Sequence, residues 1–495
     1  MSQPSSPADI TSAVEHFRSA PPIPVPHRYS VLKAIRSFLV EQNQSLLDAL
    51  SSDLGRARYE SVISDIEIAL SSTDEAISHL NDWVRSRSVP TPLIAMPGSS
   101  RIKPYPKGTV LIISPFNFPV QLAICPLVSA IAAGNRCVLK PSELTPATSA
   151  LFANSLVKYI SPSILRVIVG GPETSTLLLQ QKFDHIFFTG SERVGKIVLQ
   201  AAAVHLTPVT LELGGKSPVI MCQGSNIDLA AKRIMWSKWV NCGQTCIACD
   251  YAIVIAPHYD QFIEACSDAL SSFAAGSSVA ESPSYSRIVS QAHTMRLKGL
   301  IDLCSSSIIC GGDVDIESRF CAPTIIGPVD IDSELLKSEI FGPILPVVKV
   351  SSIDEAIKLS NRVCSTPLAL YIFGSSDQAE QIISQTQSGT VCVNDCVVQH
   401  AVPSFPFGGV GHSGMGQSHG IYGFRTFSHM RPILERSANS IFDVSIRYPP
   451  YSEKSEKLLV MAMRCTRLTS SSLIAAAMMA ICVVIVAVVA GFMLK

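Results

Sequence analysis

The chain has 495 residues, of which 47% are hydrophobic and 16% charged, and its 39 Lys and Arg residues balance 39 Asp and Glu residues. This length allows two or three domains with large buried cores. The balanced charge disfavours nucleic acid as a partner, because no overall field attracts a polyanion. The 15 cysteines lack the spacing of a disulfide framework and the first thirty residues lack an apolar signal core, so we expect a catalytic part that faces the reducing cytosol.

Helical periodicity extends over residues 28–85, and prolines interrupt residues 90–106. Short apolar, β-branched runs then alternate with segments of helix length, a pattern typical of βαβ units in a parallel sheet. A second alternation of this kind begins near Pro218 and ends near Val393. Residues 403–416 are rich in Gly and Pro and should form a loop. The pattern predicts an α/β fold in which a Rossmann-like, doubly wound nucleotide-binding domain precedes a second α/β domain.

The segment Leu473–Leu494 contains 22 residues without a charge. As a helix it would extend about 33 Å, enough to cross a hydrocarbon core. Buried core helices of that length rarely lack charges, so we predict a C-terminal transmembrane anchor. Arg464 and Arg467 precede the segment, which favours a catalytic domain on the cytosolic side, although Lys495 follows it.

Two side chains indicate covalent catalysis. Cys246 ends the run Asn241-Cys242-Gly243-Gln244-Thr245-Cys246, and Glu212 begins Glu212-Leu213-Gly214-Gly215-Lys216. Cysteine attacks as the thiolate, and with a free pKa of about 8.5 it needs a polar environment or a neighbouring base to react at neutral pH. Cys246 is therefore the candidate nucleophile and Glu212 the candidate base.

Two turns are candidates for binding a nucleotide. Gly190 and Gly195 follow a predicted strand and open a helical run, where small residues allow a phosphate to approach free backbone N–H groups. An ordinary strand-to-helix turn has the same composition. Lys140 and Glu143 follow another short strand, where they could hold ribose hydroxyls or form a solvated turn.

Several motifs, taken together, resemble those of the aldehyde dehydrogenase superfamily. They are the run 108–143, the segments 212–216 and 241–246, Glu339-Ile340-Phe341-Gly342-Pro343, residues 389–395 and Pro406-Phe407-Gly408-Gly409-Val410-Gly411. Within the superfamily the chain resembles the class 3, membrane-bound fatty aldehyde dehydrogenases, because of Arg447-Tyr448-Pro449-Pro450-Tyr451, the lack of a long N-terminal extension and the apolar tail. The match covers nearly the whole chain after residue 10.

The resemblance implies a role for each candidate catalytic residue. Cys246 would attack the aldehyde carbon, and the side-chain amide of Asn117 would hold the resulting oxyanion together with the Cys246 backbone N–H. Glu212 would be the general base that activates water against the thioester left on Cys246. The product would be a carboxylic acid.

The resemblance also implies NAD as the cofactor. Glu339 and Phe341 would contact the nicotinamide ribose, and Ser191 the pyrophosphate. Lys140 and Glu143 would bind the adenosine ribose. Because the Glu143 carboxylate would repel a 2′-phosphate, we expect NADP to be used more weakly than NAD.

Cys249 stands where the family commonly has proline. A disulfide between Cys246 and Cys249 that blocks the nucleophile is one hypothesis, and the simpler one, a small buried residue that replaces another, is favoured. Cys242, Cys246 and Cys249 find no further Cys-x-x-Cys or His pair to complete four ligands, so we predict no metal site.

Two further departures, Phe116 in place of the usual tryptophan and Ser338 in place of an acidic residue, remove no group that the mechanism needs. His400 and His412 are excluded as catalytic residues, because a single loop histidine more often has a structural role.

The predicted organisation has five parts: 1–210, N-terminal helices and NAD-binding domain with a bridging segment at about 88–106; 211–402, catalytic domain; 403–450, bridging and oligomerisation segment; 451–472, gate helix and linker; 473–494, transmembrane anchor. We expect a homodimer that oxidises long-chain or other apolar aldehydes at a membrane. For the membrane we favour the endoplasmic reticulum over the mitochondrial outer membrane, the peroxisome and the lipid droplet. The alternatives are a thioester hydrolase or esterase that uses the same Cys–Glu pair, and a non-catalytic, membrane-attached scaffold that binds a cofactor.

Overall fold

The computed structural model describes residues 7–276 and 278–465. The predicted transmembrane anchor, 473–494, lies outside these residues. Within the two described ranges, no helix combines the length and the apolar character needed to cross a bilayer.

Contacts divide the chain into two compact units. Among the described residues, the larger unit contains 7–80 together with Pro106–Ser428. The smaller unit contains Asn81–Tyr105 and the described residues 429–465.

The first part of the larger unit is helical. Its helices are α1 (Pro7–Arg18), α2 (Val25–Glu41), α3 (Asn43–Leu54), α4 (Arg58–Ser61) and α5 (Glu67–Trp83), with the π-helical turn η1 (Val62–Ile66) between the last two. On α2 the buried side chains Leu32, Ile35 and Leu39 recur every three or four positions, so one apolar face turns inward. Gly55 ends α3 in the left-handed conformation, with φ 57°, which glycine adopts without strain.

A six-stranded sheet follows, in the order β17-β7-β6-β3-β4-β5. Its parallel strands are β3 (Thr109–Ile113), β4 (Arg136–Lys140), β5 (Leu165–Val167), β6 (His185–Gly190) and β7 (Val209–Leu213), and β17 (Gly414–Met415) is antiparallel to β7. The predicted loop 403–416 thus ends in a short edge strand, because its backbone pairs with the otherwise open edge of β7. From β3 the chain proceeds first to β4 and β5 on one side and then to β6 and β7 on the other, so the order reverses between β3 and β6, as in a doubly wound fold.

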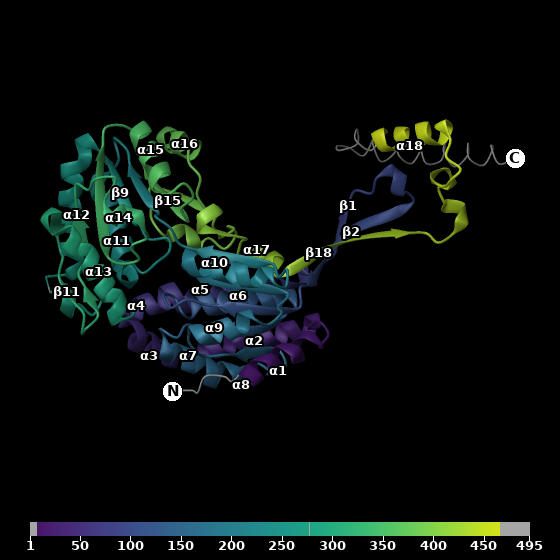
Figure 1. The fold of residues 1–495 in the computed structure, drawn as a ribbon, viewed down its shortest axis with the longest axis horizontal. Coiled ribbons are helices and arrows are strands. Elements are labelled where there is room, and N and C mark those ends of the chain that lie inside the picture. Colours follow the sequence, from purple (N-terminus) through teal and green to yellow (C-terminus); the bar gives the residue numbers. More distant parts are fainter. Residues whose placement is uncertain (1–6, 277, 466–495) are drawn as a thin grey trace. The chain divides into compact units, whose positions relative to one another are not determined.

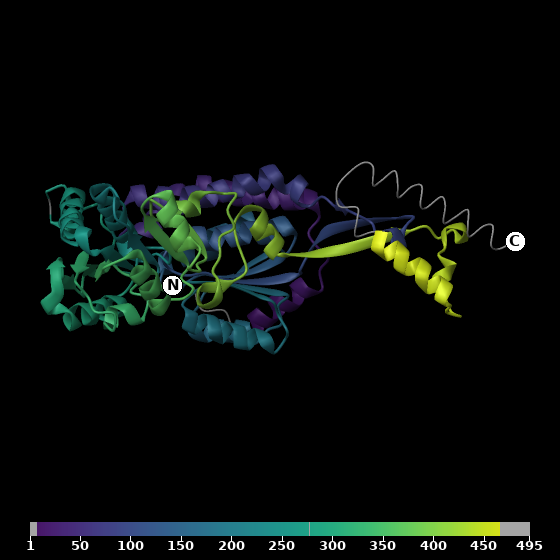
Figure 2. The same ribbon diagram turned by 90° about the horizontal axis from the view of Figure 1, so that it is seen from above.

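Helices cover both faces of this sheet (Figure 1, Figure 2). They are α6 (Gln121–Ala133), α7 (Pro146–Leu151), the π-helical turn η3 (Phe152–Leu156), α8 (Val157–Tyr159), α9 (Pro172–Leu179) and α10 (Glu192–Ala203). One face packs against α1, α9 and α10 through a cluster of buried apolar side chains. The other face packs against α6, which is apolar on all sides and is itself covered by α2.

The seven-stranded sheet has the order β10-β13-β14-β9-β8-β15-β16. Its strands are β8 (Pro218–Met221), β9 (Tyr251–Ile255), β10 (Ile308–Cys310), β13 (Thr324–Ile326), β14 (Ile344–Val350), β15 (Ala369–Phe373) and β16 (Thr390–Val393), all parallel except β10. The helices around it are α11 (Ile227–Trp239), α12 (Tyr259–Ala274), α13 (Gln291–Leu303), α14 (Glu334–Lys337), α15 (Ile353–Val363) and α16 (Ser376–Ile383), and β11 (Val314–Asp315) pairs with β12 (Phe320–Cys321) beside it. Separate apolar clusters on the two faces bury this sheet, as a parallel sheet requires.

The smaller unit contains a three-stranded sheet in the order β1-β2-β18. Its strands are β1 (Arg87–Val89), β2 (Gly98–Pro106) and β18 (Ser428–Arg436), and helix α18 (Glu453–Cys465) follows in the chain. Arg101 on β2 and Glu435 on β18 form a bidentate ion pair that joins the two strands, with N–O distances of 2.9 and 2.6 Å. Helix α17 (Gly420–Thr426), by contrast, belongs to the larger unit and packs against α6.

Candidate active site

The loop that carries Cys246 connects α11 to β9 and has a constrained backbone. Asn241 and Cys242 both have a φ of 52°, which non-glycine residues adopt only when their surroundings enforce it. Gln244 supplies part of that constraint, because its Nε2 donates to the carbonyls of Asn241 and Arg287 at 3.0 Å each. The candidate nucleophile therefore lies on a preorganised loop.

The same loop is tied to Asn117 by a buried polar network. Asn241 Nδ2 donates to the Asn117 carbonyl at 2.8 Å, and Arg56 donates to the same carbonyl. Arg56 also forms an ion pair with Asp65 at 2.9 Å in which both side chains are fully buried. Burial raises the pKa of Asp65 to about 6, although the Arg56 charge opposes the shift. The backbone next to the predicted oxyanion donor is thus held in place.

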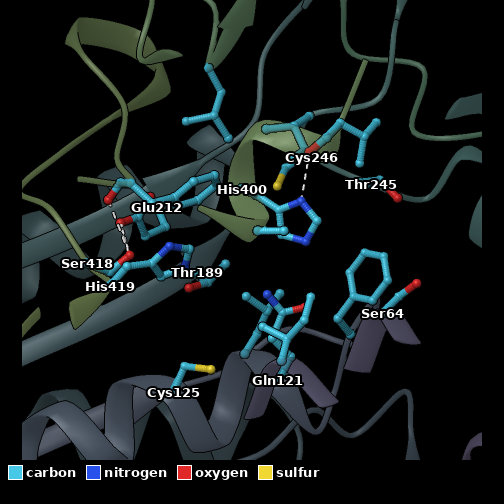
Figure 3. A pocket seen from close by; sticks show the side chains of 18 of the residues that line it. Ser64, Gln121, Cys125, Thr189, Glu212, Thr245, Cys246, His400, Ser418 and His419 are labelled. Carbon is cyan, nitrogen blue, oxygen red and sulfur yellow. Dashed lines mark hydrogen bonds between the residues drawn. The ribbon is translucent and has the colours of Figure 1, made fainter. Parts of the chain in front are cut away.

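Cys246 and Glu212 line one cavity of about 240 Å³ (Figure 3). Most of its other lining side chains are aliphatic or aromatic: Ile63, Ile68, Phe118, Leu122, Phe187, Leu213, Trp236, Val240, Ile247, Leu368, Val397, Val398, Phe407 and Phe427. Burial, followed by the charges of Glu339 and Glu212, raises the pKa of the Cys246 thiol to about 12. The thiol is therefore protonated in the free protein and needs a proton acceptor before it can attack.

Glu212 is held on β7 and is buried. Its Oε1 accepts a hydrogen bond from Ser418 Oγ at 3.1 Å, whereas its Oε2 has no hydrogen-bond partner among the described residues. Burial raises the pKa of Glu212 to about 8, and the Ser418 hydrogen bond opposes the shift. A carboxyl group with such a pKa can accept and return a proton near neutral pH.

The predicted phosphate turn lies at the carboxyl end of β6. Ser191 caps α10, and its hydroxyl accepts from Val194 N at 3.5 Å. A Cβ on Gly195 would lie 2.8 Å from the Leu213 side chain, so glycine lets α10 lie against β7 without displacing that side chain. A Cβ on Gly190 would lie 2.6 Å from the Phe188 ring. This small-residue turn before a helix N-terminus, beside the reversal in strand order, fits a dinucleotide pyrophosphate.

The remaining predicted cofactor residues lie outside the cavity, in two groups. Buried Lys140 and partly exposed Glu143 form an ion pair at 2.5 Å beyond the end of β4. Glu339 lies against Gly214, where a Cβ would meet its carboxylate at 2.3 Å, and burial followed by the Asp250 charge raises the pKa of Glu339 to about 8. Phe341 has a φ of 49°, and its ring lies edge-on to Phe116 at 5.7 Å between centroids.

Sequence reasoning missed Arg56, Asp65 and Ser418, which belong to no motif and meet the site only through the fold. His400 lines the cavity, and its Nδ1 is 2.7 Å from the Val397 carbonyl. His412 contacts Glu192 on the surface.

The Sγ of Cys249 lies 3.3 Å from the Sγ of Cys396, and both side chains are buried. Cys249 therefore contacts a thiol in the segment after β16. Within the ranges that the structure describes, no cluster of His, Cys, Asp and Glu could hold a metal ion.

A doubly wound sheet with a phosphate turn lies in one unit with a cavity that presents a thiol and a buried carboxylate, which is the combination expected from the resemblance to aldehyde dehydrogenases. The model of the Aldehyde dehydrogenase family matches residues 3–433, and the chain belongs to this family, as its motifs predict.

Aldehyde dehydrogenase family 3 member A2 of Rattus norvegicus is 42% identical over 438 residues, which are 88% of this chain and 90% of the relative. Aldehyde dehydrogenase family 3 member B1 of Homo sapiens is 41% identical over 450 residues, or 91% of this chain and 95% of the relative. Among solved structures, a substrate-bound state of Staphylococcus aureus AldH superposes with a TM-score of 0.87 at 39% identity and covers 91% of this chain and 97% of that one. These relatives confirm the predicted resemblance to family 3 and the assignment as an enzyme.

Proposed function

We propose that the chain oxidises apolar aldehydes to carboxylic acids with NAD, through a thioester on Cys246. The observation that carries the proposal is that Cys246 and Glu212 face one cavity whose walls are largely aliphatic and aromatic. An apolar chain gains about 0.8 kcal/mol for each methylene that it buries, so such a cavity favours longer aldehydes.

In the proposed reaction, Cys246 Sγ bonds to the aldehyde carbon and its proton passes to a base. The oxygen that becomes negative is held by the Asn117 amide and the Cys246 N–H. The fixed Asn117 backbone supports this role, because Arg56 and Asn241 both donate to its carbonyl. Bound NAD would supply the acceptor for the hydride that leaves the same carbon, and a thioester would remain on Cys246.

Hydrolysis of the thioester requires a base, and we assign this role to Glu212. Its unpaired Oε2 takes a proton from water while the water oxygen bonds to the thioester carbon. The C–S bond then breaks, the proton passes from Glu212 to the Cys246 sulfur, and the carboxylic acid leaves, so that both side chains are restored.

We assign the adenosine ribose to Lys140 and Glu143, and the nicotinamide ribose to Glu339 and Phe341. The pairing of Lys140 with Glu143 supports the first assignment, because it holds the two side chains of the predicted ribose site together beside the end of β4. Because the Glu143 carboxylate would repel a 2′-phosphate, NAD should be preferred over NADP.

A burst experiment tests the chemistry. Glu212→Gln should release about one NADH per active site and then turn over at least about 100-fold more slowly than wild type, since we assign Glu212 to deacylation alone. A missing burst would show that Glu212 also accepts the proton of Cys246. Cys246→Ala should give neither burst nor turnover. Hydrolysis without any NADH would instead support a thioester hydrolase, and cofactor binding without turnover a scaffold.

A series of straight-chain aldehydes tests the substrate class. For the wild type, kcat/KM should rise about fourfold with each added methylene until the chain fills the cavity, as 0.8 kcal/mol per methylene requires. A kcat/KM that does not change with chain length would contradict the assignment to apolar aldehydes.

We propose further that residues 473–494 anchor a homodimer, joined through the bridging segment 403–450, to the cytosolic face of the endoplasmic reticulum. The uncharged composition of 473–494 supports the anchor.

A truncation after Ser472 should keep its rate on short aldehydes in buffer and lose rate on long aldehydes in vesicles. An additional loss after truncation at Tyr451, confined to long aldehydes, would support a gate formed by the segment that contains α18. Equal rates in vesicles for all three proteins would contradict both the anchor and the gate.

A further inference from the structure

Backbone contacts at Ser418, and four residues before it, fix Ser418 beside Glu212. Before it in the chain, Gly414 of β17 is the register partner of Glu212 on β7. At Ser418 itself, the backbone exchanges two hydrogen bonds with Phe407, at 3.2 and 2.7 Å. The fold therefore places the Ser418 hydroxyl next to the Glu212 carboxylate, although the two residues are 206 positions apart.

The Ser418 hydroxyl has two acceptors within reach. Its Oγ lies 3.1 Å from Glu212 Oε1 and 3.2 Å from the Phe407 carbonyl oxygen. A hydroxyl has one hydrogen to donate and lone pairs with which to accept. When Glu212 is ionised, or carries the proton on Oε2, Ser418 donates to Oε1; when the proton is on Oε1, Ser418 accepts from that carboxyl group and donates to Phe407. Rotation of one O–H bond thus satisfies both forms of Glu212 without moving its carboxyl group.

The second oxygen of Glu212 has a different environment. Oε2 is buried and has no hydrogen-bond partner within the described residues, and Figure 3 shows the Glu212 side chain beside Ser418 at the cavity. A buried carboxylate oxygen without a partner is costly unless something occupies the space before it, such as the attacking water.

We propose that Ser418 is the positioning residue of Glu212: its hydroxyl holds Oε1 in both protonation states and leaves Oε2 directed at the water that cleaves the thioester. This inference rests on the proposed role of Glu212 as the general base.

Four other titratable side chains line the cavity with Glu212: Cys125, Cys246, His400 and His419. Burial raises the pKa of each of the two thiols to about 12. Burial lowers the pKa of both histidines, that of His419 to about 4. All four are therefore neutral between pH 7 and 9, and the Ser418 hydroxyl is the lining group that favours the ionised form of Glu212. Loss of the hydroxyl should move the pKa of Glu212 further upward.

The test compares Ser418→Ala with Ser418→Thr, which keeps the hydroxyl, in the full-length protein with NAD and a short aldehyde. Stopped flow gives the rate of the NADH burst, steady-state assays from pH 6 to 10 give kcat, and mass spectrometry measures the acyl group on Cys246. Ser418→Ala should leave the burst rate within about twofold of wild type, lower kcat about tenfold at pH 7 and accumulate acyl-enzyme, as loss of a hydrogen bond to a charged group predicts. The pH at which kcat reaches half its maximum should rise by about one unit.

Ser418→Thr should retain most of the activity and an unshifted pH profile. An unshifted profile for Ser418→Ala, or an equal loss of burst rate and kcat, would overturn the inference, because a purely structural role would affect both steps. A threonine variant that behaves like the alanine variant would overturn it too. If Glu212→Gln deacylates normally, the proposed function itself fails; if Glu212→Gln stalls as expected while Ser418→Ala matches wild type, only the role of Ser418 fails.

Discussion

Replacement of Glu212 by Gln should stabilise the protein in alkaline solution, at the expense of catalysis. Burial raises the pKa of Glu212 from 4.5 to about 8, so the folded protein binds a proton there that the unfolded chain has released. The sign follows from linkage: the stability associated with protonated Glu212 is fully present below pH 4.5 and is lost as the pH rises through 8. Glutamine does not titrate. At about 1.4 kcal/mol per pKa unit, the free energy of unfolding of Glu212→Gln, relative to that of the wild type, should be roughly 5 kcal/mol higher at pH 9 than at pH 4.5.

Urea unfolding followed by tryptophan fluorescence measures this difference. The free energy of unfolding of the wild type, relative to Glu212→Gln, should fall by about 1.4 kcal/mol per pH unit between pH 5.5 and 7.5 and level off above pH 8.5. Other titrating groups affect both proteins equally and cancel. Glu317→Gln, at an exposed position, is the matched control and should follow the wild type at every pH. Parallel curves for wild type and Glu212→Gln would refute the reasoning, because Glu212 would then titrate alike in the folded and unfolded chains.

Three further outcomes are expected. Cys246→Ala should abolish NADH production while the dissociation constant for NAD, from fluorescence titration, changes less than about threefold; turnover above about 1% of wild type would place the nucleophile elsewhere. Glu143→Gln should raise the ratio of kcat/KM for NADP to that for NAD, since it removes a charge that repels the 2′-phosphate, and an unchanged ratio would contradict the ribose assignment. Arg56→Met should lower the free energy of unfolding in urea by about 3–5 kcal/mol, because it leaves the buried Asp65 without its ion-pair partner. The double variant with Asp65→Leu should recover much of that loss. Equal stability of Arg56→Met and wild type would show that the ion pair does not stabilise the fold.

The sequence by itself determined the family, the α/β class and the identity of the residues proposed for chemistry. These features depend on local signals. Alternating strands and helices leave a periodic apolar pattern, and a nucleophile such as Cys246 needs a particular loop around it, so both can be recognised from neighbours in the chain. The 22 uncharged residues at 473–494 are equally a property of composition alone.

Only the tertiary structure decided which hydrogen bonds hold those residues and how far burial shifts their pKa values. Glu212 receives its hydrogen bond from Ser418, and Arg56 reaches Asn241 across 185 positions. Neither Ser418 nor Arg56 belongs to a motif, since a hydrogen-bond partner can be supplied by any segment that the fold brings within about 3 Å. The pKa of Glu212 likewise depends on burial, which follows from the packing of β7, β17 and the cavity walls, and a position along the chain does not reveal it.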